Sequence, residues 1–140
     1  MKKKLIFLIL VLVILFIAIF WGWMYASRNR RTYELTLPFL EKVQSISLKQ
    51  NDQMQKIDDA TQIKEIRNIL MGTKRITQKE SMEDFPFSFQ DGIKVDFNLK
   101  EGGTSSFFVY LKNKQYYIEQ PYNGIYPITK EEYHSLIEYL

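Results

Sequence analysis

Cysteine is absent from this 140-residue sequence, and histidine occurs once, at His134. Without cysteine the chain has no disulfide framework, thiol nucleophile, thiolate metal ligand or site of cysteine lipidation. His134 lies beside an apolar helical stripe near the C-terminus, which favours an ordinary surface position. A serine–histidine pair and a histidine metal cluster are therefore excluded. We expect no metal ion, no cofactor and no enzyme activity.

Acidic residues are missing from the first 32 positions, although six lysines and arginines lie there. The remaining residues carry 13 basic and 16 acidic side chains, which leaves that part about three charges negative. The overall charge of +3 thus belongs to the N-terminal part. Because the rest of the chain has no visible basic patch, nucleic acid is not expected as a partner.

An uncharged apolar run of twenty residues extends over residues 5–24. At about 1.5 Å per residue, this length matches a hydrocarbon core of roughly 30 Å. A cleaved signal peptide has a shorter apolar region that ends in small residues, whereas this run ends in Trp21, Trp23 and Met24. We therefore predict an uncleaved transmembrane anchor over residues 1–27 and a tether over residues 28–36.

Basic residues flank this run on both sides, so the positive-inside rule is nearly balanced. Three lysines at residues 2–4 precede the run, and Arg28, Arg30 and Arg31 follow it. The N-terminal amine and the short N-terminus favour a cytoplasmic start. We predict a single-pass cell-membrane protein with a cytoplasmic N-terminus and an extracytoplasmic domain over residues 37–140.

The domain begins with a strand pattern at residues 43–50 and a return strand at residues 54–57. Asp59 precedes an apolar stripe with a period of 3.6 residues, which predicts a capped helix over residues 60–71. For residues 73–90 we expect an extended loop that returns its aromatic side chains to the core. The phenylalanines of this loop are Phe85, Phe87 and Phe89.

Residues 93–100 alternate apolar and polar side chains, as is typical of a strand with one wet face. Turn residues separate two further strands at 105–111 and 115–120, and 125–126 is a candidate for a short fourth strand. A capping box at Thr129 begins the last helix. The predicted fold class is α+β: a transmembrane helix, then a small domain of order β-β-α-β-β-β-α with an antiparallel meander.

Four segments of the sequence are similar to those of a known protein family, namely IKEIRNIL, SMEDFP, IKVDFNLKEGG and YYIEQPYNGIYPI. They resemble a family of domains of unknown function that occurs in small membrane-anchored proteins of Gram-positive bacteria. The resemblance covers about residues 37–128, and YYIEQPYNGIY is its most specific part. That family has no assigned activity, so the resemblance implies a membrane location rather than a reaction.

Acidic side chains are plentiful, but ordinary roles account for them. Asp59 precedes a helix, and Asp96 lies on the wet face of a strand. Paired catalytic carboxylates are therefore not expected. The pair Gly102-Gly103 lacks the lysine and the helix of a phosphate-binding loop, and Ser81 has no partner base in the sequence.

Aromatic residues are the unusual feature, with eight tyrosines and seven phenylalanines after residue 32. One interpretation is that these large rings fill a small hydrophobic core. The alternative is a tyrosine-rich surface for a protein, peptide or glycan partner.

Strand register decides between these alternatives. A turn at residues 113–114 pairs Tyr110 with Tyr117, and an odd-numbered loop at residues 102–104 pairs Phe97 with Val109. This register keeps one apolar face and leaves an aromatic second face, which we predict to be exposed and to bind the partner. The residues of this predicted site are Phe108, Tyr110, Tyr117, Glu119 and Tyr122.

Taken together, these patterns predict a membrane-anchored extracytoplasmic binding or sensing module of unknown ligand. One alternative is an immunity-type or envelope-stress protein that acts on a membrane target. The other alternative, an envelope enzyme, has the least support among the residues.

Overall fold

The computed structural model describes residues 1–28, 31–86 and 89–140, which divide into two compact units, Met1–Arg31 and Thr32–Leu140. The first unit contains helix α1 (Lys2–Arg28). This helix is long and apolar enough to cross a membrane, and the side chains of its apolar window are not buried. Expectations for Arg30 and Phe87 lie outside the described residues.

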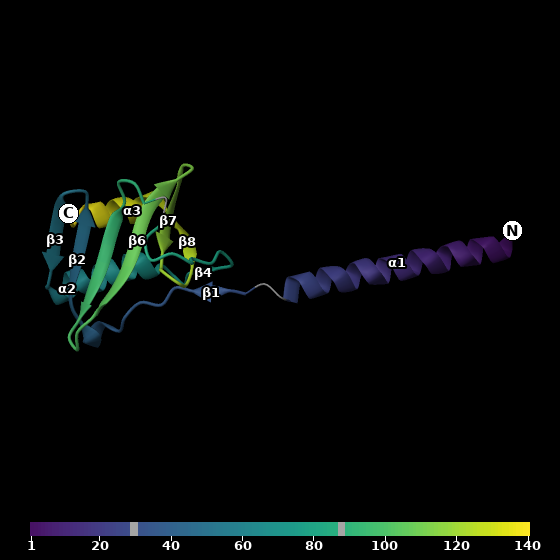
Figure 1. The fold of residues 1–140 in the computed structure, drawn as a ribbon, viewed down its shortest axis with the longest axis horizontal. Helices are drawn as coiled ribbons and strands as arrows, with labels where there is room; N and C mark the ends of the chain where they lie inside the picture. The colour runs from purple at the N-terminus through teal and green to yellow at the C-terminus, as the bar shows by residue number, and fades with distance from the viewer. Residues whose placement is uncertain (29–30, 87–88) are drawn as a thin grey trace. The chain divides into compact units, whose positions relative to one another are not determined.

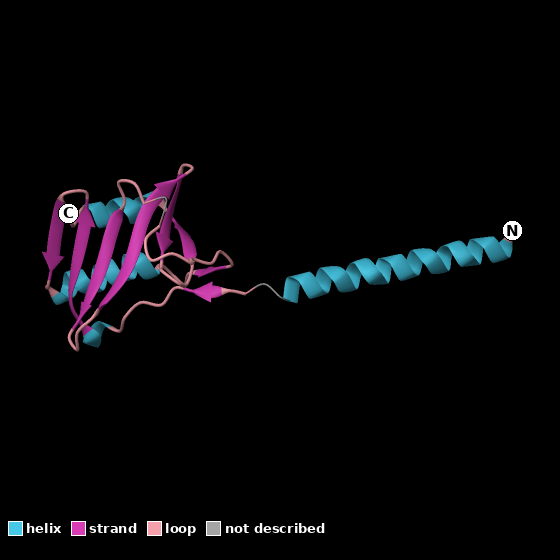
Figure 2. Cartoon of the chain, in the orientation of Figure 1, coloured by secondary structure: helices cyan, strands magenta, loops and turns pink. Residues whose placement is uncertain are grey.

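An antiparallel sheet dominates the second unit, Thr32–Leu140 (Figures 1 and 2). In the described part of the chain this sheet has six strands in the order β3-β2-β5-β6-β7-β8, all paired antiparallel. The predicted α+β class and its meander are confirmed. The strands are β2 (Val43–Gln50), β3 (Gln53–Ile57), β5 (Ile93–Leu99), β6 (Thr104–Lys112), β7 (Gln115–Glu119) and β8 (Ile125–Ile128).

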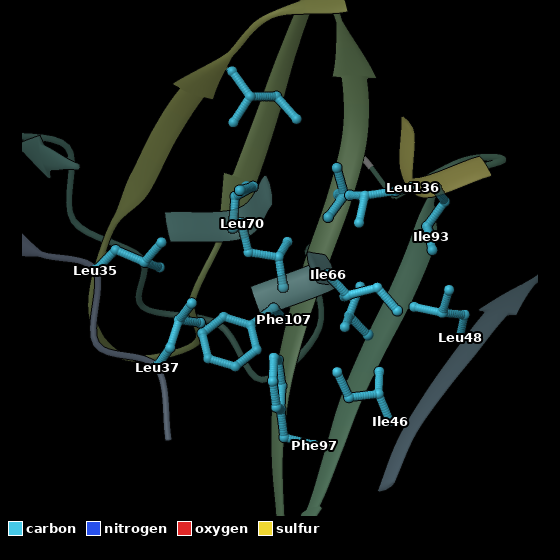
Figure 3. Packing of buried hydrophobic residues seen from close by; sticks show 14 of the residues in the cluster. Leu35, Leu37, Ile46, Leu48, Ile66, Leu70, Ile93, Phe97, Phe107 and Leu136 are labelled. Carbon is cyan, nitrogen blue, oxygen red and sulfur yellow. The ribbon is translucent and has the colours of Figure 1, made fainter. Parts of the chain in front are cut away.

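Helices α2 (Ala60–Met71) and α3 (Lys130–Ile137) pack on the same face of this sheet (Figure 2). The Asp59 carboxylate caps α2 by accepting from the Gln62 N–H, and Thr129 and Glu132 form the predicted capping box of α3. Alternate strand residues and the apolar helix stripes meet in one core (Figure 3). The core includes Ile46, Leu48, Ile66, Leu70, Ile93, Val95, Phe97, Phe107, Val109, Ile118, Tyr126 and Leu136.

The hairpin between β5 and β6 has the expected odd parity but a different register. The Leu99 N–H donates to the Gly103 carbonyl over 3.1 Å, so the loop spans residues 100–102 rather than 102–104. Phe97 consequently pairs with Ser105 instead of Val109. Because any odd loop preserves the face of each side chain, Phe97 and Phe107 still share the core, with ring centroids 5.6 Å apart.

The folded unit begins earlier than the predicted boundary at residue 37. Strand β1 (Tyr33–Glu34) pairs with β4 (Ile76–Thr77), and Leu35 and Leu37 are buried in the core. A 3₁₀ helix, Leu40–Lys42, then leads into β2. The predicted tether over residues 28–36 is therefore too long, because burial of these two leucines holds its last residues on the domain.

Arg75 joins α2, β8 and α3. Its guanidinium donates to the Leu70 carbonyl (2.6 Å) and the Ile69 carbonyl (3.1 Å) at the end of α2. It also donates to the Pro127 carbonyl in β8 and lies 2.7 Å from the Glu132 carboxylate in α3. Removing Arg75 would leave several carbonyls and a half-buried carboxylate without this donor.

We expect Arg75→Met to lower the free energy of unfolding by at least about 2 kcal/mol, because it breaks several charge-assisted hydrogen bonds at once. Lys74→Met is the matched control, since Lys74 forms an exposed ion pair with Glu34 and should cost less than about 1 kcal/mol. Urea unfolding of residues 32–140 measures both values. Equal losses in the two variants would contradict a special role for Arg75.

Candidate functional site

The sheet face opposite the helices is polar over strands β2, β5 and β6. The Asn98 amide donates to the hydroxyls of Ser45 (3.1 Å) and Ser47 (3.0 Å). The Asp96 carboxylate accepts from Ser106 (2.6 Å) and from Lys94 (2.9 Å). Cross-strand pairing places these side chains side by side, so this part of the face satisfies its own hydrogen bonds.

A loop segment crosses the aromatic part of this face. We call it the strap; its described residues are 78–86 and 89–92. Phe85, Phe89 and Phe108 pack edge to face, with ring centroids 5.0–5.1 Å apart. The prediction that this loop returns its aromatic side chains to the core is wrong for Phe85 and Phe89, because their partner Phe108 lies on the opposite face of the sheet.

The predicted site residues do share one sheet face or its edge, but the strap buries most of them. Phe108 and Tyr110 are each 2% exposed and Glu119 is 3% exposed. Tyr117 is half-buried, and the Lys79 ammonium lies 5.2 Å from its ring centroid. Tyr122 is 66% exposed. The expected exposure of the aromatic face is thus wrong for Phe108, Tyr110 and Glu119, which cannot contact a partner directly while the strap is in place.

Glu119 is the buried charge that holds the strap. Its carboxylate accepts from the Ser81 hydroxyl of the strap over 2.6 Å and from the Tyr110 hydroxyl of β6 over 2.5 Å. Burial, followed by the hydrogen bond and negative charge of Glu119, raises the pKa of Tyr110 well above its ordinary value. Tyr110 therefore stays a neutral donor, and Ser81 has a partner that sequence reasoning missed because the two residues are 38 positions apart.

A hollow of about 290 Å³ opens beside the strap, near the β2–β3 turn. The Gln50 amide donates to the Asp91 carbonyl over 2.8 Å, which ties the strap end to β2. Gly92 lies so close to Phe89 and the Val109 carbonyl that a Cβ would come within 2.6 Å of both. We call this the Phe85 hollow. It is lined by Lys49, Asn51, Phe85, Phe89, Asp91, Gly92 and Lys94.

The β7–β8 turn holds the segment that leads into the domain. The Gln120 amide accepts from the Thr36 N–H over 3.0 Å and donates to the Thr36 carbonyl over 2.9 Å. The Asn123 amide donates to the Glu34 carbonyl over 2.9 Å and to the Gln120 side-chain oxygen over 2.7 Å. We call this arrangement, residues 120–124 with residues 33–37, the clamp.

Gly124 and Tyr126 pack against each other next to the clamp. A Cβ at Gly124 would lie 2.7 Å from both the Thr77 methyl group and the Tyr126 hydroxyl, so glycine is required by the close packing. The Tyr126 hydroxyl is buried and has no hydrogen-bond partner among the residues that the structure describes. Burial, together with the negative charge of Glu34, raises the pKa of Tyr126 to about 12.

Comparison with known proteins places this arrangement in a family. The family model DUF5301, described as a domain of unknown function (DUF5300), matches residues 31–127. The chain belongs to the DUF5301 family. The match includes β1, the strap and the clamp, and it begins close to the start of the folded unit rather than at residue 37.

The DUF5301 domain also resembles a solved structure, an NMR structure of a protein from Ruminococcus gnavus. The two share 31% sequence identity with a TM-score of 0.59, over 71% of this chain and 98% of that one. Among the curated proteins, no relative matches this chain. Family membership confirms the resemblance expected from YYIEQPYNGIY, and the structure shows that this segment of the DUF5301 domain contributes most of β7, the turn of the clamp and the first residues of β8.

A metal site needs several His, Cys, Asp or Glu side chains close together. Within residues 1–28, 31–86 and 89–140, no group of three or more His, Cys, Asp and Glu side chains could hold a metal ion. His134 lies on the exposed side of α3, beside the rings of Tyr116 and Tyr133.

Loss of the hydroxyl group should change the free energy of unfolding differently at two buried tyrosines, Tyr110 and Tyr126. Tyr110→Phe removes a donor to a buried carboxylate and should cost about 1.5–3 kcal/mol of unfolding free energy. Tyr126→Phe removes an unpartnered buried hydroxyl and should leave stability unchanged or raise it by up to about 1 kcal/mol. Urea unfolding of residues 32–140 measures both. A loss in Tyr126→Phe as large as that in Tyr110→Phe would contradict these assignments.

Proposed function

We propose that this protein is a membrane-anchored extracytoplasmic binding module, with α1 as its transmembrane segment. The main support is that α1 is apolar over a membrane-spanning length and that the side chains of its apolar window are not buried. A helix that is apolar all round needs a nonpolar surrounding, and a bilayer supplies one. Trp21, Trp23 and Tyr25 at its C-terminal part suit the headgroup region.

Orientation is part of the proposal and concerns the charges that flank α1. Lys2, Lys3 and Lys4 lie on its N-terminal side, and Arg28, Arg30 and Arg31 lie on its C-terminal side. Because these charges nearly balance under the positive-inside rule, the proposed cytoplasmic N-terminus and external domain are tested directly by the accessibility of the domain to protease.

Full-length protein should remain in the membrane fraction after washing with high salt and carbonate, because α1 is held by apolar burial rather than by charge. Protease added outside intact spheroplasts should digest the domain. Replacing Leu10 and Leu12 with arginine should release the protein from the membrane, since charge at the centre of a span is strongly disfavoured. Mature protein in the medium that starts near Ser27 would disprove the anchor.

We further propose that the Phe85 hollow, rather than the buried aromatic face, receives the ligand. Phe85 is 55% exposed and lines this hollow with an apolar ring. Lys49, Asn51 and Asp91 provide ammonium, amide and carboxylate groups around it. Its volume of about 290 Å³ lies just below the range of roughly 300–1,000 Å³ that is typical of small-molecule pockets, so it suits a side chain of an extended peptide or one sugar ring of a glycan.

Catalysis is not part of this proposal, because the buried acid of the domain has a structural role. Both oxygens of Glu119 accept hydrogen bonds from hydroxyl groups of its own chain. Glu119 is 3% exposed at the base of a hollow of about 300 Å³ that Ser81 also lines, so its two oxygens are occupied by these bonds rather than presented to a substrate.

A photoreactive phenylalanine analogue at Lys49, at the mouth of the hollow, should crosslink the partner in intact cells. The same analogue at Leu111, which is exposed outside the hollow, is the matched control and should not. Phe85→Ala should remove the crosslink at position 49 without changing the far-ultraviolet circular dichroism spectrum. Digestion of the product by protease or by a muramidase separates a peptide from a glycan. Equal crosslinking from positions 49 and 111 would argue against this site.

A further inference from the structure

The chain that connects α1 to the domain is short enough to restrict the position of the clamp. Helix α1 ends at Arg28 and β1 begins at Tyr33. A fully extended chain over this interval reaches roughly 17 Å. The clamp fixes residues 33–37 on the domain through the side chains of Gln120 and Asn123. If α1 spans the membrane, as proposed above, the clamp must stay close to the lipid headgroups.

Exposed apolar side chains gather on the segments that contact the clamp. Ile76 is 53% exposed and pairs with Glu34 between β4 and β1. Met82 is 77% exposed and follows Ser81, whose N–H donates to the Asn123 carbonyl. Tyr122 lies in the clamp turn itself, and the nearby Asp84 carboxylate of the strap raises the pKa of the Tyr122 hydroxyl. Three separate segments thus present an apolar or amphipathic side chain at this end of the domain.

The opposite edge of the sheet provides a comparison. Met54 lies on β3, which is at the far end of the strand order from β8 and the clamp. Its side chain is 67% exposed, close to the value for Met82. Met82 on the clamp side and Met54 on the distant edge are therefore exposed methionines of similar accessibility.

We propose that the DUF5301 domain rests on the outer membrane surface through Ile76, Met82 and Tyr122. The occupant of this apolar surface is the lipid headgroup layer, because the short connection delivers the clamp to it. Apolar and tyrosine side chains are favoured in that layer, where one end of the ring is apolar and the other wet. The contact depends on the proposed anchoring of α1, and it sets which side of the domain faces away from the bilayer.

Local charge indicates which lipids matter. Lys74 and Lys79 lie near this surface, but Glu80, Glu83 and Asp84 lie there as well and are exposed. Attraction to anionic lipids is therefore offset by the carboxylates. The contact should depend on burial of the three apolar side chains and should be insensitive to anionic lipid and to salt.

Absence of native cysteine makes the test direct. Single-cysteine variants Met82→Cys and Met54→Cys of the full chain, each labelled with a polarity-sensitive fluorophore, are reconstituted into phosphatidylcholine vesicles with and without phosphatidylglycerol. We expect nitroxide-headgroup lipids to quench the label at position 82 several-fold more than the label at 54. Iodide in the water should quench them in the reverse order. Neither result should change with phosphatidylglycerol or with high salt.

Trp21 and Trp23, the two tryptophans of the chain, report on the anchor separately. If the protein floats with the vesicles and bromine on the acyl chains quenches these tryptophans, α1 is inserted. Equal quenching at positions 82 and 54 would then overturn the surface contact and leave the anchoring intact. Protein that does not float, with unquenched tryptophans, would overturn the proposed anchoring and the contact that rests on it. A contact that requires phosphatidylglycerol would replace apolar burial with charge attraction and overturn the proposal as stated.

Discussion

Two helices cannot cover both faces of a wide sheet, and this geometric limit shapes the rest of the domain. The main sheet is roughly 25 Å across at about 4.8 Å between strands. Two helices packed side by side, each about 10 Å in diameter, cover roughly one such face. Helices α2 and α3 lie together over the core, so a loop must cover the aromatic part of the other face.

The strap meets this requirement, and it creates a dependence between two distant parts of the sequence. Once the strap covers Glu119, the carboxylate loses water and must be hydrogen-bonded by the protein. Ser81 of the strap and Tyr110 of β6 supply those bonds. Phe85 and Phe89 add aromatic packing on Phe108. The strap therefore buries the Glu119 carboxylate and also supplies, through Ser81, one of the hydrogen bonds that replace its lost water.

The segment YYIEQPYNGIY illustrates how a specific motif can serve folding rather than binding. Glu119 holds the strap, Gln120 and Asn123 hold the segment that leads into the domain, and Gly124 allows Tyr126 to pack beneath it. These roles connect the N-terminal segment, the strap and the sheet in one place. Tyr122 of this segment is also part of the surface proposed for lipid. The other residues proposed for ligand and lipid lie outside it, on the strap, on β4, on β5 and around the β2–β3 turn.

Local patterns in the sequence determined the elements. Alternation, stripes of period 3.6 and capping residues predicted the main strands and both domain helices, because these depend on neighbours a few residues apart. The side-chain faces of β5, β6 and β7 were also predictable, because an apolar core permits one parity of each hairpin. The exact loop between β5 and β6 was not, since every odd loop satisfies that rule.

Tertiary structure alone decided the candidate site. No local pattern indicates that Ser81 would reach Glu119, that Gln120 would bind the backbone of Thr36, or that Leu35 and Leu37 would be buried. Exposure of Tyr110 depended on what covers its face, and that cover comes from a polar segment far away in the sequence. Hydrophobic periodicity describes which side of an element is apolar; it carries no information about which distant loop will pack against the other side.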